Sequence, residues 1–224
     1  DVVIKINNRK VLAGLAEVAD ITDKFIAMTT AIDKLDKIGL NGVKREMAKS
    51  EISDEAIETV TNALEIKDLA TLKELFENSA TGLKGVEELE TFHTYFDLKK
   101  PTNKVEFDIT LARGLNYYTG CIFEVKADPK SYPDLVMGSI GGGGRYDDLT
   151  GIFGMKDTSG VGVFFGFARI FDVLEELDLY PAESRETLQV LLIAFDEKSH
   201  QYAFGQLNQL RAAGINAELY PDPV

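Results

Sequence analysis

Residues 111–120 read LARGLNYYTG and join two segments, 104–112 and 121–125, in which polar and apolar residues alternate. This alternation predicts two strands of an antiparallel sheet. The connection carries side chains suited to binding, because an arginine fork fits a carboxylate or phosphate and a tyrosine adds one hydroxyl to an apolar face. The pattern predicts either a ligand-binding loop or a surface hairpin in which Arg113 is solvated.

A second motif is rich in glycine. Twelve of the 19 glycines lie between Gly114 and Gly166, so this region specifies backbone shape rather than side-chain burial. Residues 141–144 are four consecutive glycines, and glycine in a strand often marks the close approach of a ligand or another backbone. The missing Gly-Lys-Ser/Thr ending excludes a Walker phosphate loop. The alternative is a flexible linker, which the strand-like residues 135–137 disfavour.

A third motif, GVGVFFGFAR at residues 160–169, predicts a strand that runs into a helix. Arg169 falls in the first turn of that helix, where the positive end of the helix dipole attracts anions. The motif predicts either an anion-binding site or an ordinary strand-to-helix junction with Arg169 on the surface.

Composition excludes several classes of protein. Of the 224 residues 45% are hydrophobic, which is enough for a sizeable core. No run approaches the roughly 20 apolar residues that cross a bilayer, so we expect no membrane partner.

The single Cys121 excludes an internal disulfide and a cysteine-based zinc site and fits a cytoplasmic setting. The distant His93 and His200 support neither nucleophilic catalysis nor a metal site. A net charge of −13 excludes a protein that coats nucleic acid electrostatically.

Helical periodicity dominates the first hundred residues. Residues 2–7 predict a strand, and residues 10–100 then change to three- and four-residue spacing of apolar side chains. Ser53 and Asp68 are placed to cap two of these helices, and Gly39 is placed to stop another. We expect a helical block inserted after a strand.

The end of the chain predicts a separate domain. A polar linker at 181–187 precedes residues 188–224, which read strand, helix, strand. This order predicts a parallel pair and the start of an α/β domain. Both ends of the chain look cut, so we expect a fragment of a longer protein.

In this order the three motifs resemble those in the second half of the sequence of histidyl-tRNA synthetase family members. The match rests on RGLNYYTG followed by the strand FEV, on GGGGRYD, and on the pattern G-x-G-x-x-x-G-x-x-R entering a helix. The opening VIKINNRKVL is similar to the strand and helix after the family's second class-defining motif. The resemblance implies an α+β fold, a class II aminoacyl-tRNA synthetase-like antiparallel sheet flanked by helices.

The resemblance also implies four segments. Residues 1–40 would belong to the catalytic domain and residues 41–100 to a helical insertion domain. Residues 101–181 would form the catalytic core with the histidine-specific motifs and the third class motif. Residues 188–224 would begin a truncated anticodon-binding domain.

The implied activity is that of a histidine–tRNA ligase, which activates L-histidine with ATP and Mg²⁺ and transfers it to tRNA(His). Arg113 would lie between the amino-acid carboxylate and the ATP α-phosphate, while Tyr117 and Tyr118 would line the histidine pocket. Four glycines would form the floor of that pocket: Gly141, Gly142, Gly143 and Gly144. The ATP site would add Gly162, Gly166 and Arg169, with Arg169 on the outer phosphates.

The chain departs from the family pattern in two ways. Ala168 stands before Arg169, where the family usually has an acidic residue, which would loosen the orientation of Arg169. The first and second class motifs, with a further ATP-binding arginine, are absent. The full-length enzyme would be a homodimer, and we expect this chain alone to be inactive.

Two other readings compete with the ligase. Synthetase-like paralogues serve as regulatory subunits of ATP phosphoribosyltransferase or sense uncharged tRNA within a kinase, and they tend to lose catalytic arginines. The presence of Arg113 and Arg169, followed by an anticodon-type domain, favours the ligase. A structural α+β interaction module, in which the glycines are only turns, is the other alternative.

Overall fold

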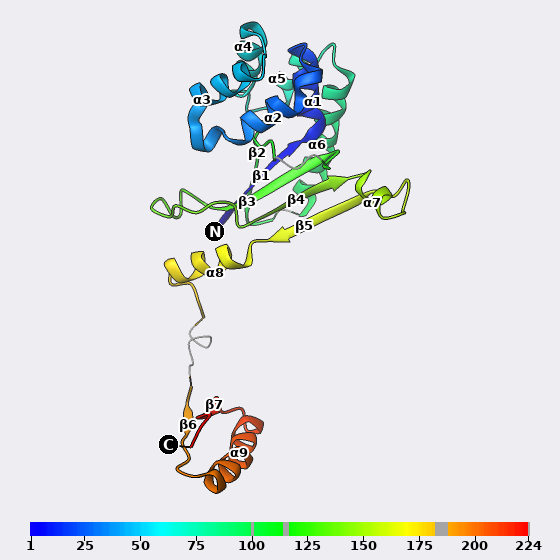
Figure 1. Cartoon of the computed structure of the whole chain (residues 1–224). Helices are drawn as coiled ribbons and strands as arrows, with labels where there is room; N and C mark the ends of the chain where they lie inside the picture. Colours follow the sequence, from blue (N-terminus) through cyan, green and yellow to red (C-terminus); the bar gives the residue numbers. More distant parts are fainter. Residues whose placement is uncertain (100, 114–116, 182–187, 224) are drawn as a thin grey trace. The chain divides into compact units, whose positions relative to one another are not determined.

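The computed structural model describes residues 1–99, 101–113, 117–181 and 188–223 (Figure 1). The chain divides into two compact units, residues 1–173 and 174–224. Residues 114–116 of the first motif lie outside the described residues, as does the predicted linker beyond Pro181.

The sheet of the first unit is mixed. Its strands, in the spatial order β2-β1-β3-β4-β5, are β1 (Val2–Asn8), β2 (Lys104–Phe107), β3 (Cys121–Ala127), β4 (Gly141–Tyr146) and β5 (Gly160–Phe165). The pairs β1–β3, β3–β4 and β4–β5 are antiparallel, which confirms the predicted antiparallel arrangement for most of the sheet. Strand β2 instead pairs parallel to β1. This pairing is possible because the intervening helices supply the long crossover that parallel neighbours require.

Two predicted strand segments are shorter or absent. The segment 104–112 ends as a strand at Phe107, because Asp108 turns the chain: its carbonyl accepts from the Leu111 amide at 3.0 Å, and its Oδ1 accepts from the Thr110 amide at 3.0 Å. Residues 135–137 are not in a strand but belong to the connection between β3 and β4.

Residues 9–99 form the predicted helical block. Its helices are α1 (Arg9–Val18), the short 3-10 helix η1 (Thr22–Lys24), α2 (Phe25–Asp33), α3 (Leu35–Lys49), α4 (Asp54–Ala63), α5 (Leu69–Leu75) and α6 (Ala80–Lys99). Ser53 and Asp68 accept hydrogen bonds from the backbone amides of Ala56 and Thr71, which confirms both predicted N-caps. Gly39 has a non-helical backbone (φ +65°, ψ 172°) and interrupts α3 at a kink between two helical segments, as its predicted role as a stop indicates.

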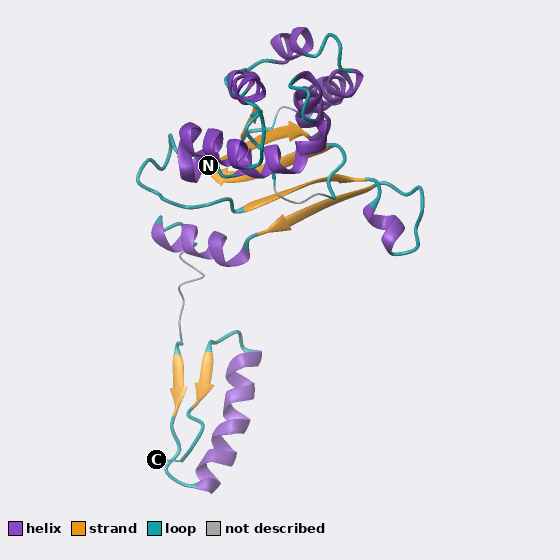
Figure 2. Ribbon diagram, turned by 45° about the horizontal axis from the view of Figure 1, so that its top comes forward, coloured by secondary structure: helices purple, strands orange, loops and turns teal. Residues whose placement is uncertain are grey.

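The helices and β1 share one hydrophobic core, whose buried residues lie between Ile6 and Ala112 in the sequence. Helix α6 packs against α1, β1 and β3. A Cβ on Gly14 of α1 would lie 2.4 Å from the Gly82 Cα of α6, so glycine lets these two helices touch. Figures 1 and 2 show the block gathered toward the β1 side of the sheet, away from β5.

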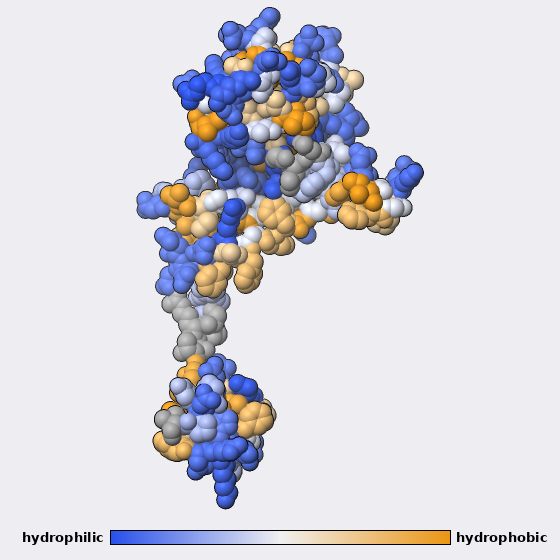
Figure 3. Space-filling model, in the orientation of Figure 1, coloured by the Kyte–Doolittle hydropathy of each residue, from blue (hydrophilic) through white to orange (hydrophobic). Residues whose placement is uncertain are grey.

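Strand β5 remains exposed. After the short α7 (Leu149–Ile152), β5 leads into α8 (Phe167–Glu176), and large apolar side chains on these elements face solvent. They include Val161, Val163, Phe165 and Phe167. Figure 3 shows apolar side chains gathered over the β5–α8 region and around α7.

The second unit contains β6 (Val190–Leu192), α9 (Glu197–Ala212) and β7 (Ala217–Leu219), and β6 pairs parallel to β7 as predicted. Helix α9 begins with a capping box between Asp196 and Ser199 and is followed by Gly214 at φ +79°. No helix among the described residues is long and apolar enough to cross a membrane.

Candidate functional site

The glycines of β4 create a face of the sheet without side chains along its middle. Gly142 is paired with Phe164 of β5, and Gly144 is paired with Gly162. Because alternate residues of a strand point to opposite faces, these positions all belong to one face, which we call the glycine face. Gly141 and Gly143 belong to the other face.

Arg113 lies on the glycine face, over Gly142. Its Nη1 donates to the Phe123 carbonyl at 3.2 Å, and its guanidinium carbon lies 4.9 Å from the centre of the Phe164 ring. A Cβ on Gly142 would lie 2.1 Å from Arg113 Nη1. Glycine at this position is therefore what allows the guanidinium to rest against the strand.

Tyr118 lies beside it, over Gly144. A Cβ on Gly144 would lie 2.7 Å from a carbon of the Tyr118 ring, which is only 5% exposed and packs against Leu111 and Ile122. Burial, together with a hydrogen bond to Tyr117, raises the pKa of Tyr118 to about 12. The hydroxyl thus stays protonated at neutral pH and keeps its ability to donate a hydrogen bond.

Two further tyrosines complete an aromatic cluster. The Tyr117 ring lies 4.6 Å from the Tyr118 ring and 6.2 Å from the Tyr146 ring, measured between centroids. A Cβ on Gly160 would lie 2.2 Å from the Tyr146 ring, and one on Gly162 would lie 3.1 Å from it. Tyr146 was absent from the sequence-based site, although the RYD that follows the four glycines was the signal that could have found it.

Gly143 serves the packing of strands on the opposite face. A Cβ there would lie 2.0 Å from the Gly162 carbonyl oxygen and 2.7 Å from the Phe123 ring. Gly141 is less crowded, with the Phe164 carbonyl oxygen at 3.2 Å from such a Cβ. Of the four predicted floor glycines, two therefore lie under Arg113 and Tyr118 and two do not.

Arg169 occupies the first turn of α8, as predicted, and its Nη1 donates to the Ser139 carbonyl at 2.7 Å. Gly166, just before the helix, is fixed by a hydrogen bond of 2.8 Å from its amide to the Ile140 carbonyl. Arg169 also lines a cavity of about 540 Å³, together with Leu111 and Ala112, the two residues that precede Arg113. The cavity is thus lined by Arg169 of the third motif and by the two residues that precede Arg113 in the first.

Charged side chains of β1 and β3 form another wall of this cavity. Lys5 Nζ lies 2.6 Å from Asp108 Oδ2, and Lys126 Nζ lies 2.9 Å from Asp36 Oδ2 and 3.3 Å from Glu124 Oε2. Burial raises the pKa of Asp108, but hydrogen bonds from Lys5 and Thr110 outweigh it, so the pKa is lowered. Sequence reasoning did not single out these residues, because a strand with alternating charges reads as a solvated face.

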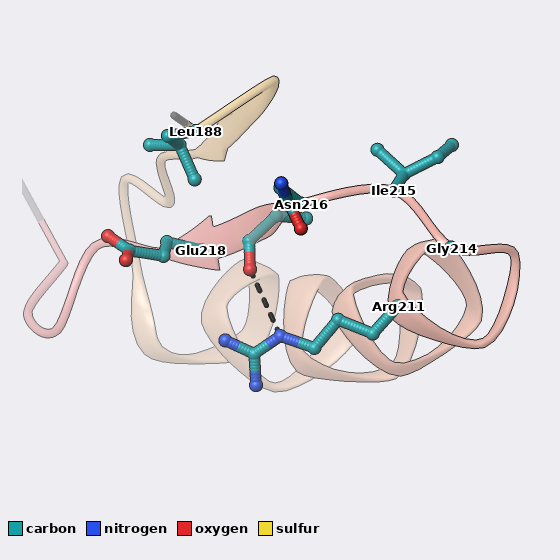
Figure 4. A pocket seen from close by; sticks show the side chains of 7 residues that line it. Leu188, Arg211, Gly214, Ile215, Asn216 and Glu218 are labelled. Atoms are coloured by element: carbon teal, nitrogen blue, oxygen red, sulfur yellow. Dashed lines mark hydrogen bonds between the residues drawn. The ribbon is translucent and has the colours of Figure 1, made fainter. Parts of the chain in front are cut away.

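A separate hollow of about 490 Å³ lies in the second unit (Figure 4). Leu188, Gly214, Ile215 and Glu218 are among its lining residues, and Arg211 Nε donates to the Ala217 carbonyl at 3.0 Å. In the described parts of the chain, no group of three or more His, Cys, Asp or Glu side chains could hold a metal ion.

The fold with this glycine face is that of a class II aminoacyl-tRNA synthetase-like domain. The structure matches the crystal structure of histidyl-tRNA synthetase from Nostoc sp. PCC 7120 with a TM-score of 0.73 and 31% identity, over 100% of this chain and 53% of that chain. The family model "Histidyl-tRNA synthetase" matches residues 1–174. The chain therefore belongs to the histidyl-tRNA synthetase family.

Two other relatives define the extent of this likeness. A histidine–tRNA ligase of Bacteroides fragilis is 52% identical over 226 residues, which cover 99% of this chain and 49% of the relative. The chain thus spans about half the length of the curated relatives it matches. An ATP phosphoribosyltransferase regulatory subunit/histidyl-tRNA synthetase from Bacillus halodurans shares the fold, with a TM-score of 0.64 and 19% identity over 98% of this chain and 53% of that chain.

Proposed function

We propose that this chain supplies the second half of a histidine–tRNA ligase, which activates L-histidine with ATP and then transfers it to tRNA(His). The proposal is carried by Arg113, which rests on Gly142 next to the buried Tyr118. Membership of the family and 52% identity to a ligase support it further.

In the proposed reaction the histidine carboxylate attacks the α-phosphorus of ATP, and pyrophosphate leaves. Negative charge grows on the non-bridging oxygens as the transition state forms, and a fixed cation beside them lowers its free energy. The Arg113 guanidinium is suited to this role because the sheet and the Phe164 ring hold it in place before substrate arrives.

Tyr118 is suited to hold the imidazole of histidine. Its hydroxyl, with a pKa of about 12, stays neutral and can donate to an imidazole nitrogen or accept from it. Tyr117, which is 38% exposed, would contribute the outer wall of the pocket. Gly142 and Gly144 would form its floor, while Gly141 and Gly143 would support that floor from the other face.

Arg169 is suited to the outer phosphates of ATP, which binds with Mg²⁺ as a substrate complex. It combines a full charge with the N-terminal end of α8, and both attract anions. Its bond to the Ser139 carbonyl holds the side chain at the wall of the 540 Å³ cavity. This bond would take the place of an acidic residue at position 168, where this chain has Ala168. Gly162 and Gly166 would border the adenine.

The remaining half of the family's length would complete the site. The solvent-exposed side chains of Val161, Val163 and Phe165 form an apolar surface of the kind that packs against further protein. We therefore propose that this chain is inactive alone, and that the complete ligase is a cytoplasmic homodimer.

The test uses a joined enzyme, made by fusing the half of the Bacteroides fragilis ligase that this chain does not match to residues 1–224. The joined enzyme should catalyse histidine-dependent ATP–pyrophosphate exchange, and the 224-residue chain should not. Exchange by the short chain would contradict the proposed division of the site. Histidine binding by a joined enzyme without any exchange would favour the regulatory-subunit alternative.

A further inference from the structure

Asn7 near the end of β1 and Arg9 at the start of α1 together hold both ends of the segment that carries Arg113 and Tyr118. Asn7 Nδ2 donates to the Ile109 carbonyl at 3.1 Å and to the Leu111 carbonyl at 3.0 Å. The next contact along the chain comes from Arg9, whose Nη1 donates to the Ala112 carbonyl at 3.4 Å. These bonds reach the residues immediately before Arg113.

Arg9 also holds the far end of the segment. Its backbone amide donates to the Gly120 carbonyl at 2.9 Å, two residues after Tyr118. The guanidinium is itself fixed, because it lies 4.5 Å from the centre of the Phe25 ring and is 6% exposed. The bonds from Asn7 and Arg9 thus join the junction of β1 and α1 to residues 109–112 and 120, which lie about a hundred positions away.

The burial of the polar Asn7 side chain has a cost in free energy that its hydrogen bonds must explain. Asn7 is fully buried, and no hydrogen-bond partner is found for its Oδ1 among the described residues. A buried acceptor without a partner costs free energy, which the two bonds from Nδ2 to the Ile109 and Leu111 carbonyls must offset. The two amide hydrogens of Asn7 are both directed to the loop that leads to Arg113.

We propose that Asn7 and Arg9 are positioning residues, which act on catalysis through Arg113. This inference rests on the proposed function, since it concerns the same site. By holding the carbonyls of residues 109, 111 and 112, the two side chains set the position of the Arg113 backbone, and thereby where its guanidinium meets Gly142. A shift of about 1 Å at such a group can cost on the order of 100-fold in rate.

Asn8 provides a matched control. It is an asparagine of the same strand and is also fully buried, but its Oδ1 accepts from the Lys10 amide at 2.9 Å, and its Nδ2 donates to Glu88 at 2.7 Å and to Cys121 Sγ at 3.5 Å. Asn7→Leu and Asn8→Leu therefore remove the same group from neighbouring buried positions, yet only the first removes bonds to Ile109 and Leu111, which lead to Arg113.

The first experiment measures hydrogen exchange in the 224-residue chain and needs no substrate. Asn7→Leu should speed exchange of the Thr110, Leu111 and Thr119 amides at least tenfold. Asn8→Leu should leave these amides within twofold of the original chain and speed exchange in the first turn of α1. If Asn7→Leu does not fold, Arg9→Met replaces it with the same expectation. Unchanged exchange of the three amides, or equal effects of the two asparagine variants, would overturn the proposal.

The second experiment measures adenylate formation by the joined enzyme, well below its melting temperature. Asn7→Leu should lower kcat at least tenfold with a smaller change in the KM for ATP, and Asn8→Leu should stay within threefold. In an Arg113→Ala background, Asn7→Leu should have little further effect, because both changes remove the same interaction. Additive losses would show that Asn7 does not act through Arg113. A joined enzyme without activity would refute the proposed function. The hydrogen-exchange experiment would still decide whether Asn7 holds the segment that carries Arg113.

Discussion

The ring of Tyr118 lies directly on the backbone of Gly144, at a place where even a methyl group would come within 2.7 Å of a ring carbon. The same added group would lie 2.8 Å from the Cys121 carbonyl oxygen, so backbone as well as side chain would have to move. The glycine and the tyrosine therefore have to be considered as one unit of the site.

Gly144→Ala should destabilise the chain by about 1–3 kcal/mol, the usual cost of overpacking a tight site. Urea unfolding followed by circular dichroism measures this difference. Gly151→Ala is the matched control, because a Cβ there meets nothing within 4 Å. An equal stability of the two variants would show that Tyr118 is not held against β4.

Arg113→Ala should reduce histidyl-adenylate formation by the joined enzyme by about 100- to 1000-fold, the range found when a transition-state charge partner is removed. Pyrophosphate exchange measures the rate, and circular dichroism checks that the fold is retained. Arg45→Ala, at an exposed arginine of α3, should leave the rate unchanged. A rate within threefold of the original after Arg113→Ala would contradict the role assigned to Arg113.

Tyr118→Phe should weaken histidine binding by the joined enzyme by about 1–3 kcal/mol, since a buried hydrogen bond is lost while the ring is kept. Equilibrium dialysis or calorimetry measures the dissociation constant. Tyr95→Phe, at an exposed tyrosine of α6, should leave histidine affinity unchanged.

Asp147 should make the folding stability of the chain depend on pH in the acid range. Hydrogen bonds from Thr119 and Ser159, with the nearby charge of Arg145, lower its pKa to about 2. The carboxylate therefore stabilises the fold above its unfolded pKa of about 4, and this contribution is lost as the pH falls toward 2. Asp147→Asn should lower the melting temperature at pH 7 and flatten its decline between pH 4 and pH 2.

Asp148→Asn is the control for this titration, as it removes an adjacent carboxylate outside the bonds that join Asp147 to Thr119 and Arg145. Melting curves from pH 2 to pH 7 for the original chain and both variants decide the matter. Parallel curves for the original chain and Asp147→Asn would exclude the predicted contribution.

Local patterns predicted most of the elements. The caps at Ser53 and Asp68 and the strand–helix–strand order after residue 188 depend on neighbours within a few positions, and all three predictions are confirmed. Strand β2 shows the limit of such patterns. Its alternation extends to residue 112, but the turn at Asp108 ends the strand, and its parallel pairing depends on a crossover of nearly a hundred residues.

The candidate site divides in the same way. Residue type alone pointed to Arg113, Tyr118, the glycines and Arg169, because a rigid cation, an amphipathic ring and an absent Cβ each have a chemistry that a short motif displays. The tertiary structure decided which of these meet: Gly142 and Gly144 lie under Arg113 and Tyr118, while Gly141 and Gly143 belong to the other face. It also brought in Tyr146, which the RYD after the four glycines could have suggested, and the bonds from Asn7 and Arg9, which no motif could show. The physical reason is that a face is set by the register between strands, and a hydrogen bond between residues a hundred positions apart exists only once the sheet has formed.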